Sequence, residues 1–472
     1  MTAARARALL ARHWPFLVVL AAAAVLRAAA WLAVHPAWWI LGDSISYLED
    51  AVHLAPDRWR PGGYSLMLLW PLLPAHSLAL VTAVQHLLGL GAGALVYALL
   101  LRLGLPRWAA ALAALPVLFD GYVLATEQML ASEALFGILV LGALAVLLRR
   151  PGRPSELAAY AAGTLLGLAT LTRIVGLPLI AVAALVLLLP RPAWSRAAAL
   201  CLPFAVVVGG YALWFSHVYG EVDLTASSGI FLYGRTTNFV DCGRVPFTSD
   251  RLRQLCPTEP VGRRNEIWYV FDEAAPIARM GLSATAANKL AGQFASEAIR
   301  AQPDGYALLV RDGLVESFAW DQSSLPDDMR FRSDQHLPAA ALAAAAAYQS
   351  GDPGPVYVRG LVGALDAYQG VAHVPAPVCL LALAVAAAGL LFGQDPHGRG
   401  LRAALLLTGG AAAVLLMIPA MTAIVAPRYR VPAIPALCLA AAIGCTLLVN
   451  RWSAWREEAR ARRAAPAAAA GR

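Results

Sequence analysis

Charged residues are scarce in this chain of 472 residues. Asp, Glu, Lys and Arg make up 14% of it and hydrophobic residues 59%, whereas soluble domains carry about 25% charged and roughly 45–50% apolar residues. The mean hydropathy is +0.61. This composition excludes a string of ordinary soluble domains and indicates a membrane protein.

Lysine is nearly absent, because Lys289 is the only one among 37 basic residues. The net charge of +8 therefore comes from arginines. They recur singly or in pairs at the ends of apolar runs, where the positive-inside rule places them, and they do not gather into one basic face. The pattern predicts contact with the lipid bilayer and no nucleic-acid partner. The excess of arginine and alanine is typical of a G+C-rich bacterial genome, which favours a bacterial plasma membrane.

Motifs for metal binding are also lacking. The chain has no CxxC and no HExxH, so the sequence proposes no metal site and no cofactor, and it does not indicate a divalent cation. Four of the six cysteines fall in apolar runs. Cys242 and Cys256 lie in a polar stretch expected outside the membrane, in an oxidising compartment, and are predicted to form a disulfide.

The hydropathy pattern predicts an all-α polytopic membrane protein. A span needs about 20 apolar residues, and shorter stretches survive as tilted or broken elements. About ten spans are expected, near residues 15–34, 77–101, 108–123, 129–148, 156–172, 174–190, 197–215, 376–393, 403–425 and 431–449. The stretch 64–74 is ambiguous. Within the second span, the spacing Gly89-x-Gly91-x-Gly93 indicates close helix packing, since no strand precedes it.

Charge predicts that both termini are cytoplasmic. Each inner turn of this threading is basic, with Arg102 and Arg107, Arg149, Arg150 and Arg153, Arg191 and Arg196, and Arg399 and Arg402. Of the 29 acidic residues, the inner side receives only Glu156, Asp395, Glu457 and Glu458.

This threading predicts four parts. Residues 1–215 form an N-terminal transmembrane module with an external loop at 35–64, 216–375 an external insert, 376–450 the C-terminal transmembrane helices, and 451–472 a basic cytoplasmic tail. The insert carries 18 acidic residues. It is expected to be mainly helical, with two amphipathic helices between Ser283 and Phe318 lying on the outer leaflet, separated by a turn at Pro303. Residues 323–360 are expected to form a loop.

The external loop reads LGDSISYLEDAVHLAPDRWRPGGYSLMLLW. Its apolar residues recur at helical spacing, which predicts a short amphipathic helix that starts just after Asp43 at the outer membrane surface. Asp43 then has two interpretations. It is either the N-cap of this helix or part of a site at the bilayer edge, together with Tyr47, His53, Arg60 and Tyr64. Ser46 and Glu49 are spaced as a capping box.

Two further sets of ionisable residues fall at the outer ends of the spans. Asp120 and Glu127 are most simply solvated turn residues, although Glu127 is kept as a site candidate. Glu133 lies one turn into an apolar run and is either an ion-pair partner between helices or a functional acid. Positive charges here are not explained by the positive-inside rule. They either reach to the interface or bind a phosphate there, and they are Arg173, Arg428 and Arg430.

These residues lie in motifs that resemble the GT-C superfamily of polyprenyl-phosphate-dependent glycosyltransferases. The resemblance is greatest to bacterial protein O-mannosyltransferase-like and aminoarabinose-transferase-like membrane proteins. Matching stretches occur in family order: Arg27 before GDSISY, then RPGGYSLML, EQMLASEALF, GLATLTRIVGLPL, YALWFSHVYGEVDLTASSGIFLYGR and APRYRVPAIP. They cover about residues 10–235 and 376–450, and most of the insert is unmatched.

The resemblance implies a GT-C-like fold and an inverting transfer of a sugar from a polyprenyl-phosphate donor on the external face. Asp43 matches the catalytic aspartate and is expected to be the general base, with Arg428, Arg430 and Arg173 at the donor phosphate. Many relatives carry two adjacent acids where this chain has Gly42-Asp43-Ser44, which speaks against a metal-dependent mechanism. The sugar stays open, and so does the acceptor: a protein, a polysaccharide, a lipid or a small molecule.

Two other functions remain open. A transporter or flippase of a lipid-linked sugar would grip phosphate with the same arginines, but the chain has no repeat of spans of the kind that alternating access usually uses. A non-catalytic scaffold acting through the insert is the third interpretation.

Overall fold

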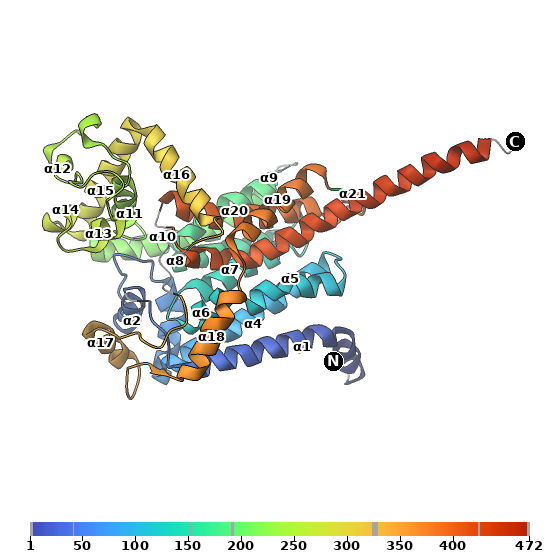
Figure 1. Ribbon diagram of the computed structural model, residues 1–472, viewed down its shortest axis with the longest axis horizontal. Coiled ribbons are helices and arrows are strands. Elements are labelled where there is room, and N and C mark those ends of the chain that lie inside the picture. The colour runs from blue at the N-terminus through green and yellow to red at the C-terminus, as the bar shows by residue number, and fades with distance from the viewer. Residues whose placement is uncertain are drawn as a thin grey trace.

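The computed structural model describes residues 3–40, 42–151, 153–189, 193–322, 329–422 and 425–469. Most of these residues are helical (Figure 1), so the prediction of a mainly helical protein is confirmed. Two short strands, β1 (Val34–His35) and β2 (Val356–Tyr357), pair antiparallel. This pairing ties the insert to the end of the first helix.

Eleven of the helices form the part expected in the membrane. They are α1 (Ala3–Ala33), α4 (Leu78–Arg102), α5 (Arg107–Phe119), α6 (Gly121–Gln128), α7 (Glu133–Leu147), α8 (Glu156–Thr172), α9 (Leu179–Leu188), α10 (Trp194–Tyr219), α19 (Ala376–Phe392), α20 (Leu401–Thr422) and α21 (Ile434–Ala469). Their apolar side chains form the main core, which α1, α4, α5, α7, α20 and α21 share.

The predicted count of about ten spans is not confirmed. In the described part of the chain, five helices are long and apolar enough to cross a membrane, or up to seven if each of two bent helix pairs is one span. One bent pair is α5 with α6, which meet at 49°, because Pro116 and the N-cap Asp120 interrupt the helix. Three predicted spans correspond to α7, α8 and α9, which have 15, 17 and 10 residues and are shorter than the roughly 20 that a span needs.

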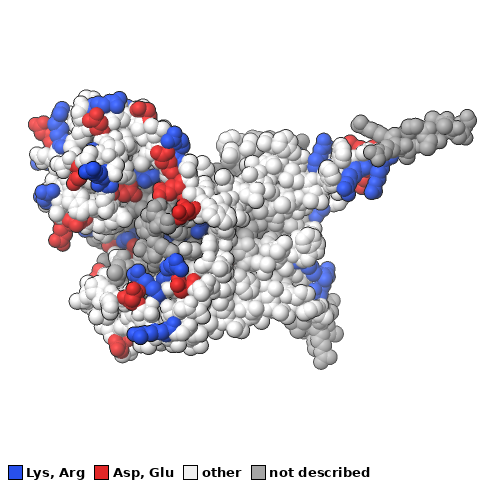
Figure 2. Space-filling view, viewed as in Figure 1, with Lys and Arg blue, Asp and Glu red and all other residues white. Residues whose placement is uncertain are grey.

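Charge separates the two ends of the molecule. Figure 2 shows a band without charged side chains in the middle of the molecule. One end beyond this band carries many residues of both charges, and the opposite end carries arginines. At that end, Arg399 donates to the carbonyl oxygens of Leu103 and Gly104, and Arg107 donates to that of Arg12. Predicted inner turns therefore lie together, on the side where Figure 1 marks both termini. Arg191, also predicted there, lies outside the described residues.

The predicted external loop contains α2 (Asp43–His53), followed by a stretch that the sequence left ambiguous. This stretch is a short apolar helical segment made of the π-helix η1 (Ser65–Leu69), α3 (Trp70–Leu72) and the 3₁₀-helix η2 (Leu73–Ala75). The apolar face of α2 packs on this segment and on α17 (Ala339–Tyr348), and the three elements share one buried cluster.

The first half of the insert forms the head in Figure 1. Its elements are α11 (Ser228–Thr237), η4 (Cys242–Arg244), α12 (Asp250–Arg253), α13 (Glu266–Phe271), α14 (Pro276–Arg279), α15 (Ala284–Ala301) and α16 (Pro303–Ser317). A disulfide joins Cys242 and Cys256. The two predicted amphipathic helices are confirmed as α15 and α16, but α15 buries Phe294 against α11 within the head instead of on the outer leaflet.

The second half of the insert returns along the membrane part. Residues 323–360 were predicted to form a loop, which is wrong for α17 and β2, while 323–328 lie outside the described residues. Gln335 donates to the carbonyl oxygen of Trp39 and accepts from its N–H. The last helix of the insert, α18 (Arg359–Val371), packs against α1 and α6. The insert thus fastens the segment that leads into α2.

Candidate functional site

The side chain of Asp43 does not cap α2. The N-cap is Gly42, whose φ of 88° suits glycine, and Asp43 is the first helical residue. Its carboxylate instead forms ion pairs with Arg60 and with Arg428, whose Nη1 lies 3.2 Å from Oδ2. The capping interpretation of Asp43 is therefore wrong, and so is the capping box, because Ser46 lies inside the helix.

Asp43 is buried but stays ionised. Burial alone would favour the neutral acid, yet the positive charges of Arg428, Arg60 and Arg173 outweigh it and hold the pKa of the carboxyl below its ordinary value. The three arginines come from η5 (Pro427–Ala433), the loop after α2 and the turn after α8. The fold thus gathers charges that lie up to 385 positions apart in the chain.

Arg173 and Glu133 form another ion pair beside those of Asp43. Arg173 donates to Glu133, the first residue of α7, and its Nη1 lies 3.4 Å from Ser132 Oγ. Tyr429 contacts an arginine of each: its ring centre is 5.2 Å from the guanidinium carbon of Arg428, which pairs with Asp43, and 5.5 Å from that of Arg173, which pairs with Glu133. Such contacts hold guanidinium groups in place without neutralising them.

The charges of this cluster do not cancel. Three guanidinium groups, of Arg60, Arg173 and Arg428, face two carboxylates, of Asp43 and Glu133. One positive charge is left over in a site whose arginine side chains are only 15–17% exposed. Arginine forks match phosphate oxygens in geometry, so the cluster suits an anion with a single negative charge.

Tyr47 and Tyr64 line the same end of α2. The hydroxyl of Tyr47 donates to Ser132 Oγ at 3.1 Å, and that of Tyr64 donates to Gln85 at 2.7 Å. Burial, with Asp43 as the next cause, raises the pKa of Tyr47 to about 12. Tyr47 therefore remains a hydrogen-bond donor at neutral pH. The two rings pack edge to face, with centres 4.8 Å apart.

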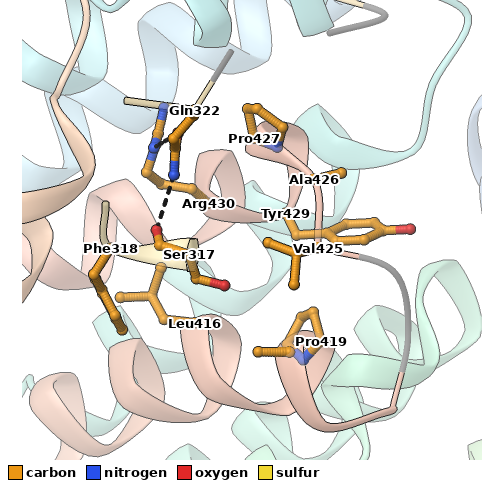
Figure 3. Close-up of a pocket in the computed structure, with 11 residues that line it drawn as sticks. Ser317, Phe318, Gln322, Leu416, Pro419, Val425, Ala426, Pro427, Tyr429 and Arg430 are labelled. Carbon is orange, nitrogen blue, oxygen red and sulfur yellow. Dashed lines mark hydrogen bonds between the residues drawn. The ribbon is translucent and has the colours of Figure 1, made fainter. Parts of the chain in front are cut away.

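Arg430 contacts Gln322 and the ring of Tyr122, whereas Asp43 pairs with Arg60 and Arg428. The Nη1 of Arg430 donates to Gln322 at 2.9 Å beside a small pocket with a cavity volume of about 30 Å³ (Figure 3). The pocket lies between the end of α16, α20 and η5, and its walls are mostly apolar, with Leu416 and Pro419 from α20. Tyr429 lines this pocket as well, so one side chain borders both the pocket and the arginine cluster.

The structure places three residues elsewhere than the sequence predicts: Asp120, Glu127 and His53. Asp120 and Glu127 are not solvated turn residues: Asp120 caps α6, and Glu127 is buried in α6, where it pairs with Arg27 and His86. His53 is exposed at the far end of α2. It lies ten positions after Asp43 along the helix, about 15 Å along the axis, so it does not join the cluster.

Several residues of this region were missed. Tyr429 and Ser132 gave no signal of their own in the sequence. Asp50 did, because it follows Asp43 by two helical turns and so shares a face of α2. Burial, followed by the charges of Asp57 and Glu49, raises the pKa of Asp50 to about 9. Among the described residues, no three His, Cys, Asp or Glu side chains are grouped to hold a metal ion.

The chain is similar to solved structures only at low sequence identity. No protein-family model and no curated protein matches the sequence. Two solved structures from Archaeoglobus fulgidus are similar. One is the archaeal oligosaccharyltransferase AglB in complex with an inhibitory peptide and a dolichol-phosphate, at 15% identity and a TM-score of 0.38, covering 96% of this chain and 52% of that one. The other is an oligosaccharyltransferase in the apo form, at 15% and 0.37, covering 94% and 52%. This chain spans about half the length of these structures.

Proposed function

We propose that this protein is a membrane glycosyltransferase of the GT-C kind that moves a sugar from a polyprenyl-phosphate donor to an acceptor hydroxyl on the external face. The observation that carries the proposal is the cluster around Asp43. It combines a carboxylate that can accept a proton with three arginines that carry one positive charge in excess.

The charge of the donor fits this excess. A sugar joined to a polyprenyl phosphate is a phosphodiester with one negative charge. Its phosphate would take Arg428 and Arg173, while the first part of its apolar chain would reach past Tyr429 toward the pocket beside α20. The donor keeps its tail in lipid, which explains a site at the edge of the apolar band.

Asp43 would act first as an ionised base and then, after it takes up a proton, as a neutral acid, and its ion pairs differ between these two states. Donor phosphate competes with Asp43 for Arg428, which weakens the hold that keeps the carboxyl acidic and makes Asp43 a better base. The acceptor oxygen then attacks the anomeric carbon and inverts it, its proton passes to Asp43, and the bond to the phosphate oxygen breaks.

Charge moves consistently through this step. The departing polyprenyl phosphate gains a second negative charge as Asp43 becomes neutral. A neutral Asp43 no longer competes with the phosphate for Arg428 and no longer forms an ion pair with Arg60, so both guanidinium groups can stabilise the leaving phosphate. The site therefore offers more positive charge in the transition state than in the ground state, which is the requirement for catalysis.

The proposed location is a bacterial plasma membrane, with both termini in the cytoplasm. The test is to incubate membranes that contain the protein with a panel of labelled polyprenyl-phosphate sugars and to follow the label. A glycosyltransferase moves label from the lipid to an acceptor, whereas a transporter or flippase moves the intact lipid-linked sugar across the bilayer. A scaffold does neither. Absence of transfer with every donor and acceptor fraction would contradict the proposal.

A further inference from the structure

A buried polar cluster inside the membrane part takes no share in the proposed chemistry. Its members are Arg27 of α1, His86 of α4 and Glu127 of α6, and none is more than 5% exposed. Arg27 Nη2 donates to Glu127 Oε1 at 2.8 Å, and His86 Nδ1 lies 2.9 Å from Glu127 Oε2. Buried ionised groups are costly within a membrane and usually have a function.

Glu127 is tightly enclosed at this position. Its carboxylate occupies the space where a Cβ atom on Gly89 of α4 would lie, so a larger residue at position 89 would displace it. The glycine spacing in α4 thus has a specific purpose at Gly89, and the cluster has one arrangement in the packed helices.

The cluster connects to Asp43 through the end of α6. Residue 128 follows Glu127 directly, and its carbonyl oxygen accepts from Trp38 N–H at 3.0 Å. Trp38 in turn accepts from Leu130 N–H at 3.0 Å, and the carbonyl oxygen of Leu130 accepts from Ser44 Oγ at 2.9 Å. Ser44 is the neighbour of Asp43 in the first turn of α2.

A second connection runs through α4. Gln85 donates to the carbonyl oxygens of Glu127 at 2.9 Å and of Met129 at 2.6 Å, and it accepts from Tyr64. The chain between α6 and α7 is therefore held from both sides, and its last residue, Ser132, accepts from Tyr47. Both connections end on α2 or on a residue packed against it.

We propose that Glu127, held by Arg27 and His86, is a positioning residue that sets the place of Asp43 through the segment 128–132. The inference rests on the proposed function for the part that Asp43 plays. It assigns to Glu127 no contact with donor or acceptor.

Glu127→Gln tests this with little change of shape. Glutamine removes the negative charge that pairs with Arg27, and it has one oxygen acceptor and one NH₂ donor. That NH₂ must face either Arg27, which is itself a donor, or His86 Nδ1, which must then be an acceptor. The cluster must rearrange, and segment 128–132 loses its support. Thr408→Val is the matched control, since Thr408 is buried in α20 and donates only within that helix.

Two measurements on the full-length protein in nanodiscs are combined. In hydrogen–deuterium exchange, Glu127→Gln should speed exchange of residues 36–47 and 128–132 about tenfold, as expected for local opening, with α21 unchanged. In the transfer assay, kcat should fall by about 10²-fold, as for a misplaced reacting group, with donor KM nearly constant. In the double variant, Glu127→Gln should not lower kcat below that of Asp43→Asn alone, because Glu127 acts through Asp43.

The outcomes separate the two proposals. If the wild type transfers sugar and Glu127→Gln changes neither exchange nor kcat more than Thr408→Val does, the inference is overturned. If no donor is used at all but the local exchange rises, the positioning stands and the proposed function fails. If Glu127→Gln also speeds exchange in α21, the variant has loosened the whole fold, and His86→Asn is tested instead. This variant leaves the pair of Arg27 and Glu127 intact and should speed exchange only in residues 36–47 and 128–132. If it does not speed exchange there, the inference is overturned.

Discussion

Arg428 and Arg430 lie two positions apart on η5 and contact different residues: Arg428 forms an ion pair with Asp43, and Arg430 donates a hydrogen bond to Gln322 beside the pocket at α20. The proposed site uses Arg428 for the donor phosphate. Arg428→Gln should therefore weaken donor binding roughly 10–100-fold, the equivalent of one or two charge-assisted hydrogen bonds. Binding of a labelled polyprenyl-phosphate sugar to purified protein measures this.

Arg430→Gln is the matched control for that variant. It removes the same charge from the same short helix, but on the side that faces the pocket. Its effect on donor affinity should stay within about threefold, as for a loss below 1 kcal/mol. Equal losses in both variants would show that the phosphate lies between the two arginines, and a larger loss in Arg430→Gln would move the phosphate to the pocket.

Asp50 should make stability depend on pH. Its carboxyl is buried, and because its pKa is raised to about 9, the folded protein keeps it neutral where an unfolded Asp, with a pKa near 3.9, is ionised. The unfolded state thus binds fewer protons between about pH 4 and 9, and the folded state loses stability as the pH rises through that window.

Asp50→Asn cannot ionise and should remove this dependence. Thermal unfolding in detergent should show a higher Tm for Asp50→Asn than for wild type at pH 8, with the difference shrinking toward pH 5. The control is Glu49→Gln, which removes an exposed carboxyl on the same helix. Because the charge of Glu49 is a lesser cause of the raised pKa of Asp50 than burial is, this variant should change the slope much less than Asp50→Asn does. Parallel curves for wild type and Asp50→Asn would mean that Asp50 is ionised in the folded protein.

The direction of insertion can be tested with single cysteines in a chain whose four free cysteines are replaced. Arg263→Cys lies in the head and His397→Cys at the arginine-rich end, and both positions are exposed. A maleimide that cannot cross membranes should label position 263 in intact cells and position 397 only after permeabilisation. The opposite result would place Asp43 in the cytoplasm and contradict the external site.

Hydropathy and charge predicted which ends of the chain segments meet, and the structure brings predicted inner turns such as those of Arg107 and Arg399 to one end. They could not predict helix lengths. Pro116 and the N-cap Asp120 break one apolar run, and Pro178 is the N-cap of α9, which has only ten residues. Mean hydropathy over a window does not register such interruptions, so it predicted longer helices. The helix α17 was missed because its alanine run carries no periodic pattern, although alanine has the highest helix propensity.

The site could be predicted as a set of residues but not as a set of pairs. Placing Asp43 and Arg428 at the outer edge follows from the threading. Their contact, across 385 positions, does not, since it depends on how η5 packs beside α2. Glu127 was misread as a turn residue because its partners, Arg27 and His86, come from two other helices and no local pattern announces them.

Asp43→Asn separates a base from a charge partner. Asparagine keeps the size of the side chain and an oxygen that can accept hydrogen bonds from Arg60 and Arg428, but it cannot take up a proton. Transfer should therefore fall by roughly 10²–10⁴-fold, the usual contribution of a general base. The measurement is kcat with saturating donor and acceptor.

Donor affinity should respond in the opposite direction. The variant raises the excess charge of the cluster from one to two and removes the carboxylate that competes with phosphate for Arg428. A tighter donor Kd together with a lost kcat is the result expected for a base. In the absence of donor the same variant should melt at a lower temperature than wild type, because Arg60 and Arg428 lose the negative charge that they pair with. Added donor should then raise the Tm of the variant more than that of the wild type. A variant that keeps near-normal kcat would show that Asp43 only holds the arginines in place. One that loses donor affinity and kcat equally would instead place Asp43 against the sugar, and the base would then be sought at Glu133.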